Sequence, residues 1–345
     1  MRNNKKMKIY YQYSKCKTLI ANGGDYVNEI GVCKALSQFA EVYYAGKLFQ
    51  PDKPDFGLNT KDIISHKDCN VIVSRANSSL INNAGGVPSI ICAVPYKPDV
   101  FKKATLIYTL SRSWGDLLRK GIKFPGINPD GVIHNNVISL GQVVDDIFKP
   151  YKTHPDIDKI RNEINADIII GMFGRITKST SPALILSIFK DIQNNFPKLK
   201  IKLMIGTKTP FDVKDDNIVI KHFTWNEMPF VYNACDIIMT NTRTPGFNYS
   251  GSIRVIEASR CGVPIIMQEA KARKEITGNY IGYIPFGTLD QVNDTNRKIL
   301  LDKFISFIGD KKLRVEAGNH LYNTSKSCTI EEKGKEYYKI FKRFK

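Results

Sequence analysis

The sequence predicts an α/β protein composed of two doubly wound domains, and three observations support this prediction. Short runs rich in β-branched and aromatic residues alternate with segments of helical spacing along most of the chain. These runs are apolar throughout, which is typical of parallel strands that helices cover on both faces. The chain has 345 residues, more than a single hydrophobic core usually organises.

Glycine, proline and polar residues separate the predicted elements. In the first half, strands are predicted over residues 7–14, 40–46, 69–76, 87–94, 104–111 and 131–139, and helices over residues 25–39 and 111–121. In the second half, strands are predicted over residues 166–175, 199–206, 217–223, 236–242, 263–267 and 278–285. Helices are predicted there over residues 181–197, 224–235 (with Thr224 as N-cap) and 250–262, and from residue 288 to the end.

A polar segment with two prolines, residues 145–165, is the predicted domain boundary. We therefore expect an N-terminal domain over residues 1–150 and a C-terminal domain over residues 151–327. The remaining residues, 328–345, are expected to form a last helix. Its aromatic residues alternate with basic ones in "EYYKIFKRFK", so the alternative to packing is a basic amphipathic segment on a membrane.

Composition excludes several classes of protein. A hydrophobic content of 42% indicates a globular chain rather than a disordered one. No run approaches the roughly 18 apolar residues of a membrane span, and no apolar region of a signal peptide follows the basic N-terminus. The 7 cysteines form no C-x-x-C pair, so we expect reduced, buried thiols in a cytoplasmic protein.

The formal net charge of +18 allows two interpretations. One is an anionic partner, which would be a nucleic acid, a membrane surface or a phosphorylated small molecule. The other is a lysine-rich composition without functional meaning, since the basic residues are spread along the chain. We do not expect nucleic-acid binding as the main role.

One carboxylate stands in a stretch that otherwise predicts burial, "NYSGSIRVIEASRCGVPIIM" at residues 248–267. Serine and glycine predict the start of a helix there, and Gly262 and Pro264 predict its end. Glu257 lies about one and a half turns into this helix, among apolar neighbours. Because an unpaired buried carboxylate costs several kcal/mol, Glu257 is expected to have a ligand or a salt bridge to Arg254 or Arg260.

Four segments of the second half together resemble one family. They are "GMFGRITKS" (171–179), "HFTWNEMPFVYNACDIIMTNT" (222–242), "GSIRVIEASRCGVPII" (251–266) and "GNYIGYIPFGTLDQV" (278–292). These segments resemble the donor-binding domain of GT-B glycosyltransferases, in particular the glycosyltransferase family 4-like enzymes (glycosyl transferases group 1). The first half resembles the family only in "ANGGDYVNEIGVCKAL" (21–36) and "ISLGQVVDDIFKP" (138–150).

The resemblance implies the GT-B fold, in which two Rossmann-like domains face each other across a cleft and the last helix packs on the N-terminal domain. It also implies catalytic cations: Arg175 and Lys178 would stabilise the donor diphosphate as the glycosidic bond breaks. A solvated basic turn is the alternative for both. Lys178 departs from the family's spacing, which places the lysine where this chain has Thr180.

In the resembling enzymes, the carboxylate at the position of Glu257 accepts hydrogen bonds from both ribose hydroxyls of the nucleotide. The other residues that the resemblance places around the nucleotide or its phosphates are Gly174, Thr224, Trp225, Gly251, Ser252 and Ile253. Gly251 and Ser252 precede a predicted helix N-terminus, which attracts phosphate, although a plain N-cap is equally expected. Trp225 is equally expected to make a helix-capping contact.

The sugar or acceptor side is less well matched. Its candidates are Gly23, Gly24, Ser111, Arg112 and Tyr249. Tyr249 stands where the family commonly has a second glutamate, and Ser111 and Arg112 stand where many relatives have a histidine. The glycines allow close backbone approach, and a turn without a ligand is the alternative.

These observations predict a cytoplasmic glycosyltransferase that moves a sugar from a nucleotide donor, UDP- or GDP-linked, to a glycan, lipid-linked or protein-linked acceptor. By resemblance alone we expect retention of anomeric configuration, no metal and no cofactor. Peripheral contact with an anionic membrane is a further expectation. The alternatives are a non-catalytic nucleotide-sugar- or glycan-binding protein of the same fold and a basic nucleic-acid-binding protein.

Overall fold

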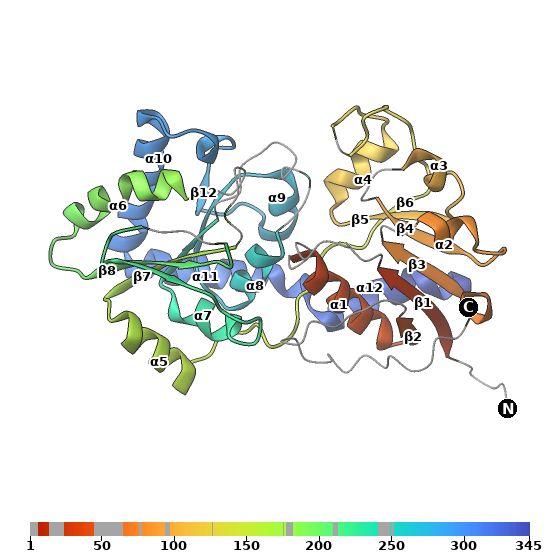
Figure 1. Ribbon diagram of the computed structural model, residues 1–345, viewed down its shortest axis with the longest axis horizontal. Helices are drawn as coiled ribbons and strands as arrows, with labels where there is room; N and C mark the ends of the chain where they lie inside the picture. The colour runs from red at the N-terminus through yellow and green to blue at the C-terminus, as the bar shows by residue number, and fades with distance from the viewer. Residues whose placement is uncertain are drawn as a thin grey trace. The chain divides into compact units, whose positions relative to one another are not determined.

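The structure is a computed structural model that describes residues 6–13, 24–44, 65–75, 78–93, 97–125, 127–174, 176, 182–209, 213–240, 249 and 252–345. The chain forms two compact units (Figure 1). The first comprises Met1–Asp145, Tyr249–Ile253 and Ser327–Lys345, and the second comprises Asp146–Asn248 and Arg254–Lys326.

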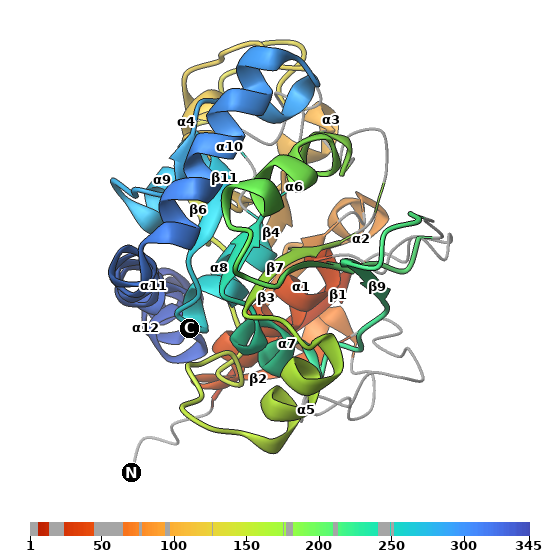
Figure 2. The same ribbon diagram turned by 90° about the vertical axis from the view of Figure 1, so that its left-hand side faces the viewer.

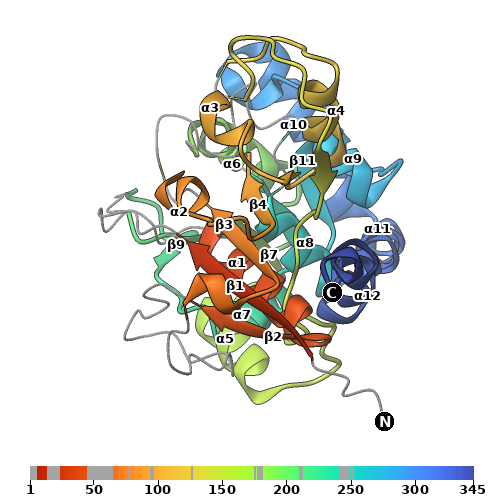
Figure 3. The ribbon, with the colours of Figure 1, turned by 90° about the vertical axis from the view of Figure 1, so that its right-hand side faces the viewer.

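The first unit contains a six-stranded parallel sheet of order β2-β1-β3-β4-β5-β6. Its strands are β1 (Met7–Tyr13), β2 (Ala40–Tyr44), β3 (Val71–Arg75), β4 (Ser89–Cys92), β5 (Leu106–Thr109) and β6 (Val137–Ser139). Its helices are α1 (Gly24–Ser37), α2 (Ser78–Asn82), α3 (Pro98–Phe101), α4 (Arg112–Arg119) and α12 (Ile330–Phe341), with short 3-10 turns η1 (His66–Asp68) and η5 (Lys342–Phe344). Helices α1 and α12 cover one face of the sheet, and α2, α3 and α4 lie on the other (Figure 3).

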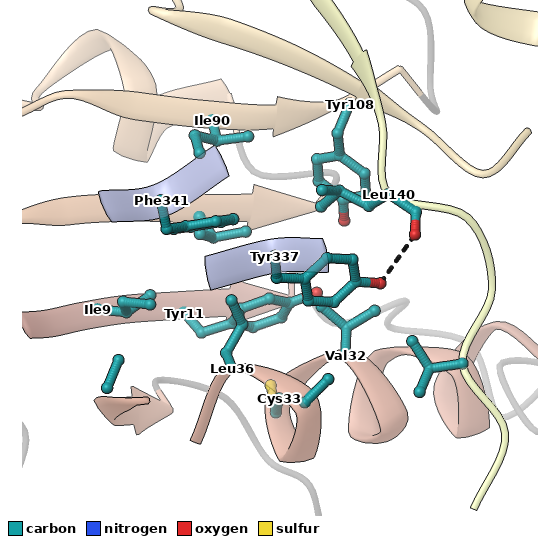
Figure 4. Close-up of a cluster of buried hydrophobic side chains, with 14 of the residues drawn as sticks. Ile9, Tyr11, Val32, Cys33, Leu36, Ile90, Tyr108, Leu140, Tyr337 and Phe341 are labelled. Carbon is teal, nitrogen blue, oxygen red and sulfur yellow. Dashed lines mark hydrogen bonds between the residues drawn. The ribbon is translucent and has the colours of Figure 1, made fainter. Parts of the chain in front are cut away.

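Helix α12 contributes directly to the core of this unit. Figure 4 shows Tyr337 and Phe341 of α12 among apolar side chains of β1 and α1, and both aromatic residues are 0% exposed. The Tyr337 hydroxyl donates a hydrogen bond to the carbonyl oxygen of Leu140 at 3.0 Å. A Cβ on Gly334 would overlap the side chain of Gln38, so glycine allows the close approach of α12 to α1.

The second unit contains another six-stranded parallel sheet, of order β12-β11-β10-β7-β8-β9. Its strands are β7 (Ile168–Phe173), β8 (Ile201–Gly206), β9 (Ile218–Lys221), β10 (Ile237–Met239), β11 (Ile265–Gln268) and β12 (Tyr283–Ile284). Its helices are α5 (Pro155–Ile164), α6 (Ala183–Asn195), α7 (Met228–Ala234), α8 (Ile253–Arg260), α9 (Lys271–Thr277), α10 (Asp294–Gly309) and α11 (Lys311–Thr324), with 3-10 turns η3 (Thr288–Asp290) and η4 (Ser325–Cys328). Helices α6 and α10 pack together on one face of the sheet, and α5 and α7 lie on the other (Figure 2).

Helix α9 was not predicted, and two further details of the second half differ from the sequence prediction. The segment 145–165, expected to be a linker, contains α5, because Pro155 opens the helix behind the cap residue His154 and Asn165 ends it in the left-handed region. The expected N-cap of α7 was Thr224, but α7 begins at Met228 behind Glu227. Thr224 instead donates its N–H and its hydroxyl to the Glu227 carboxylate, so residues 224–227 form a turn before the helix.

The expectation of reduced, buried thiols is confirmed for the cysteines in the described ranges, where 33, 69, 92, 235, 261 and 328 are buried and form no disulfide. Burial raises the pKa of Cys33, Cys235 and Cys261 well above the ordinary value. Within the same ranges, no helix combines the length and apolar character needed to cross a membrane.

Candidate functional site

The order of the second sheet indicates where a ligand would bind. From β7 the chain adds β8 and β9 on one side and then β10, β11 and β12 on the other. In open α/β sheets, ligands bind beyond the carboxyl ends of the strands at such a reversal. The candidate site of this unit is therefore the edge where β7 and β10 end, and helix α8 follows β10 in the chain.

Gly174, which directly follows β7, has a backbone that only glycine adopts readily. Its φ is +134°, and its N–H donates a hydrogen bond to the carbonyl oxygen of Gly206 at 2.8 Å. A Cβ at this position would overlap the guanidinium of Arg254. Gly174 thus allows an arginine of α8 to lie directly against the backbone at the end of the strand.

Glu257 is buried in α8, as the sequence predicted, with 4% of its surface exposed. The hydroxyl of Tyr232 in α7 donates a hydrogen bond to Oε2 of Glu257 at 2.9 Å. Neither arginine that was considered as an alternative partner forms an ion pair with this carboxylate. Arg254 lies against Gly174, and Arg260 stacks on the Tyr322 ring at 4.5 Å.

Tyr232 is a functional candidate that the sequence reasoning missed. It is 1% exposed, and its ring packs against Phe148 and Phe173. Burial, and then the charge of Glu257, raise the pKa of Tyr232 well above its ordinary value, while the charge of Arg254 acts in the opposite direction. The phenol therefore stays protonated and remains a donor to Glu257. The signal was present, because Tyr232 lies in the "VYNACD" part of a quoted segment.

The other donor-side candidates are Trp225, Ser252 and Ile253, together with three residues outside the described ranges. Trp225 packs edge-to-face on Phe148, with the ring centres 5.8 Å apart. Ser252 is half-buried directly before α8, and Ile253, its first residue, is buried. Three candidates lie outside the described residues: Arg175, Lys178 and Gly251.

The candidates for the sugar or acceptor side lie in the first unit. Ser111 caps α4: its Oγ accepts from the N–H of Trp114 at 3.2 Å, and its hydroxyl donates to the carbonyl oxygen of Tyr249. The Tyr249 ring packs edge-to-face on Phe124, with centres 4.8 Å apart. The structure thus brings Ser111 and Tyr249 together through contacts that also serve packing. Arg112 is exposed in the first turn of α4.

Of the two N-terminal glycines, Gly24 is the first residue of α1 and Gly23 lies outside the described residues. His134 is buried, and its ring packs edge-to-face against the ring of Phe101. Burial and the nearby Lys102 lower the pKa of His134.

The first unit holds a second buried carboxylate that the sequence reasoning also missed. Glu29 of α1 is 0% exposed and forms an ion pair with Arg75 at the end of β3. The Tyr11 hydroxyl donates to its other oxygen, and the Tyr108 hydroxyl lies 3.4 Å from that oxygen. Burial raises the pKa of both tyrosines well above the ordinary value.

One Asp-x-Asp sequence occurs in the chain, at Asp156 and Asp158. Both residues occupy the first turn of α5, where carboxylates interact favourably with the helix dipole. The structure, over the residues that it describes, contains no group of three or more His, Cys, Asp or Glu side chains placed to hold a metal ion.

The sequence matches no protein-family model and no curated protein. Solved structures do match over the whole chain. A glycosyltransferase from Rickettsia africae has 13% identity and a TM-score of 0.70 and covers 99% of each chain. The Anabaena protein HepE, solved in complex with UDP-glucose, has 14% identity and a TM-score of 0.68, with 98% of this chain and 100% of that chain covered. Sucrose-phosphate synthase from Thermosynechococcus elongatus has 10% identity and a TM-score of 0.64, with coverage of 97% and 98%.

Likenesses at such low identity bear on the fold alone. All three proteins match nearly the full length of this chain. The chain itself contains two parallel six-stranded sheets with helices around each. The fold class predicted from the sequence is therefore confirmed, and the chain has the GT-B fold of glycosyltransferases.

Proposed function

We propose that the protein is a glycosyltransferase that transfers a sugar from a nucleotide-sugar donor to an acceptor. The observation that carries the proposal is Glu257, a buried carboxylate on α8 whose Oε2 is held by the Tyr232 hydroxyl at 2.9 Å. The ring of that tyrosine packs on Phe173, the last residue of β7, at whose carboxyl end a doubly wound sheet binds its ligand. A carboxylate there accepts two hydroxyl groups at once, which is the chemistry that a ribose offers.

The donor is a UDP-sugar or a GDP-sugar in this proposal. Support for UDP comes from HepE, which has been solved with UDP and with UDP-glucose. By resemblance to family 4-like enzymes, transfer retains the anomeric configuration and requires no metal. The protein then contributes positioning and electrostatic stabilisation of the leaving diphosphate. A glycan, a lipid-linked or a protein-linked acceptor, contact with an anionic membrane, and a cytoplasmic location all remain predictions.

A nucleotide panel tests the donor. Thermal unfolding would be measured with UDP, GDP, ADP and their sugars, because a ligand at 100 times its Kd stabilises the native state by about 2.7 kcal/mol. The nucleotide that raises Tm would then be titrated against the wild type and Glu257→Gln. We expect at least about tenfold weaker binding for the variant, because a charge-assisted hydrogen bond becomes a neutral one.

The same variant separates the ligand from a structural role. Gln has nearly the shape of Glu, so the denaturant midpoint should change little if Glu257 serves the nucleotide. An unchanged Kd together with a clear loss of stability would remove Glu257 from the proposed site.

One observation favours a second candidate, a non-catalytic nucleotide-sugar-binding protein. At the position where the family commonly has a second glutamate, Tyr249 packs its ring on Phe124. Hydrolysis or transfer from the stabilising nucleotide-sugar, measured by release of the free nucleotide, distinguishes the two. Tight binding without release, across candidate acceptors, would favour the binding protein.

A further inference from the structure

Arg254, the second residue of α8, is a cation in a place that its own helix does not favour. The first turn of a helix carries partial positive charge, so a cation there is destabilising. Among the residues that the structure describes, no carboxylate pairs with Arg254 and its side chain takes part in no hydrogen bond. Local stability therefore gives no reason for an arginine at this position.

The structure nevertheless provides room for the guanidinium. Gly174, at the end of β7, has no Cβ, and a Cβ at this position would overlap the guanidinium. The backbone at Gly174 is fixed by its hydrogen bond to Gly206 at 2.8 Å, so this room does not depend on a movable side chain. The guanidinium lies half-buried against the edge of the sheet where ligands of such folds bind.

Arg254 also lies near the candidate ribose-binding group. Glu257 follows three residues later on α8, and residues at this spacing share a helix face, with Cβ atoms about 5–6 Å apart. The charge of Arg254 acts on Tyr232, the phenol that donates to Glu257. A cation and a carboxylate are thus placed side by side within one unit.

We infer that Arg254 binds the phosphates of the donor nucleotide while Glu257 binds its ribose, an inference that rests on the function proposed above. A nucleoside diphosphate carries both a ribose and phosphates. The planar guanidinium donates two parallel hydrogen bonds to a phosphate, which a lysine cannot do. This assigns a binding role to a residue that the sequence reasoning considered only as a salt-bridge partner of Glu257.

The test compares ligands with and without phosphate. UDP, UMP and uridine, and the corresponding guanine series, would be titrated against the wild type, Arg254→Gln, Arg254→Lys and Arg260→Gln. We expect Arg254→Gln to weaken UDP or GDP binding by about tenfold or more and to change nucleoside binding less than twofold. Arg254→Lys keeps the charge but not the two parallel donors of the guanidinium, so it should lose less affinity for the diphosphate than Arg254→Gln. Arg260→Gln is the matched control, because Arg260 ends the same helix and stacks on Tyr322.

Each outcome has one meaning. If Arg254→Gln lost affinity equally for the diphosphate and the nucleoside, Arg254 would support the fold, and the assignment would be wrong. Unchanged diphosphate binding in Arg254→Gln would also overturn it and would leave the proposed function standing. A wild type that binds none of these nucleotides would overturn the proposed function itself, and the assignment with it. If Arg254→Gln does not fold, Arg254→Lys decides, since loss of diphosphate but not nucleoside affinity is still expected.

Discussion

Tyr232→Phe removes one oxygen from the candidate donor site and nothing else. The ring keeps its contacts with Phe148 and Phe173, whose ring centres lie 6.0 and 5.3 Å from its own. The change deletes the 2.9 Å hydrogen bond to Glu257, a bond to a charged group that is worth about 1.5–3 kcal/mol. We therefore expect the free energy of unfolding to fall by about that amount.

The same change should weaken nucleotide binding. Without the phenol, Glu257 loses one of the contacts that hold its rotamer, and ordering a side chain on binding costs about 0.5–1.5 kcal/mol. The expected loss of affinity for the stabilising nucleotide is roughly two- to tenfold. Isothermal titration at pH 7 measures it, at a pH where the raised pKa of Tyr232 keeps the wild-type phenol protonated.

Tyr280→Phe is the matched control for this prediction. Tyr280 is buried in the same unit, and its hydroxyl accepts a hydrogen bond from the N–H of Ile265 at 2.8 Å. Its loss should lower stability without changing nucleotide affinity. If Tyr232→Phe lost stability yet bound the nucleotide as tightly as the wild type, the hydrogen bond would have no part in positioning Glu257.

Two further predictions concern the first unit. Removing residues 335–345 deletes Tyr337 and Phe341, both 0% exposed, so the melting temperature should fall sharply; unchanged stability with lost binding to anionic vesicles would instead make this segment a membrane anchor. Glu29→Gln removes the buried ion pair with Arg75 and should lower the free energy of unfolding by about 3–5 kcal/mol, measured in urea. A loss below 1 kcal/mol would contradict that prediction.

The fold could be predicted from the sequence because its strands are short apolar runs between breaks. Every strand of both sheets overlaps a predicted run; β7 falls within residues 166–175, and β11 extends one residue, Gln268, beyond the run 263–267. Helices α2, α3, α5 and α9 were missed. Helices α2 and α3 have only 5 and 4 residues, and α5 and α9 are mostly polar. Helix α5 buries only Ile157 and Ile164, two turns apart, and its end caps specify its limits.

The site was predicted less completely, for a different reason. Glu257 gave a local signal, a charge in an apolar run, and the structure shows it buried. Arg254 and Tyr232 both lie in segments that resemble the family, but the sequence did not show the role of either, because that role depends on a residue far along the chain. Gly174 lies against Arg254, and Tyr232 stands 25 positions before Glu257. Tyr249 was expected on the sugar side, and only the tertiary structure shows its ring on Phe124.

Glu29 and Glu257 show why a local signal does not specify a function. Both are buried carboxylates within apolar helices, so both give the same pattern in the sequence. Arg75, 46 positions away, forms an ion pair with Glu29 inside the protein, whereas Glu257 accepts a hydrogen bond from the hydroxyl of Tyr232, 25 positions away. The topology thus supplies the partner that decides the role. The two substitutions should therefore have different consequences: Glu29→Gln lowers stability with nucleotide affinity unchanged, and Glu257→Gln lowers nucleotide affinity with little change of stability, because removing a buried charge offsets the weaker hydrogen bond from Tyr232.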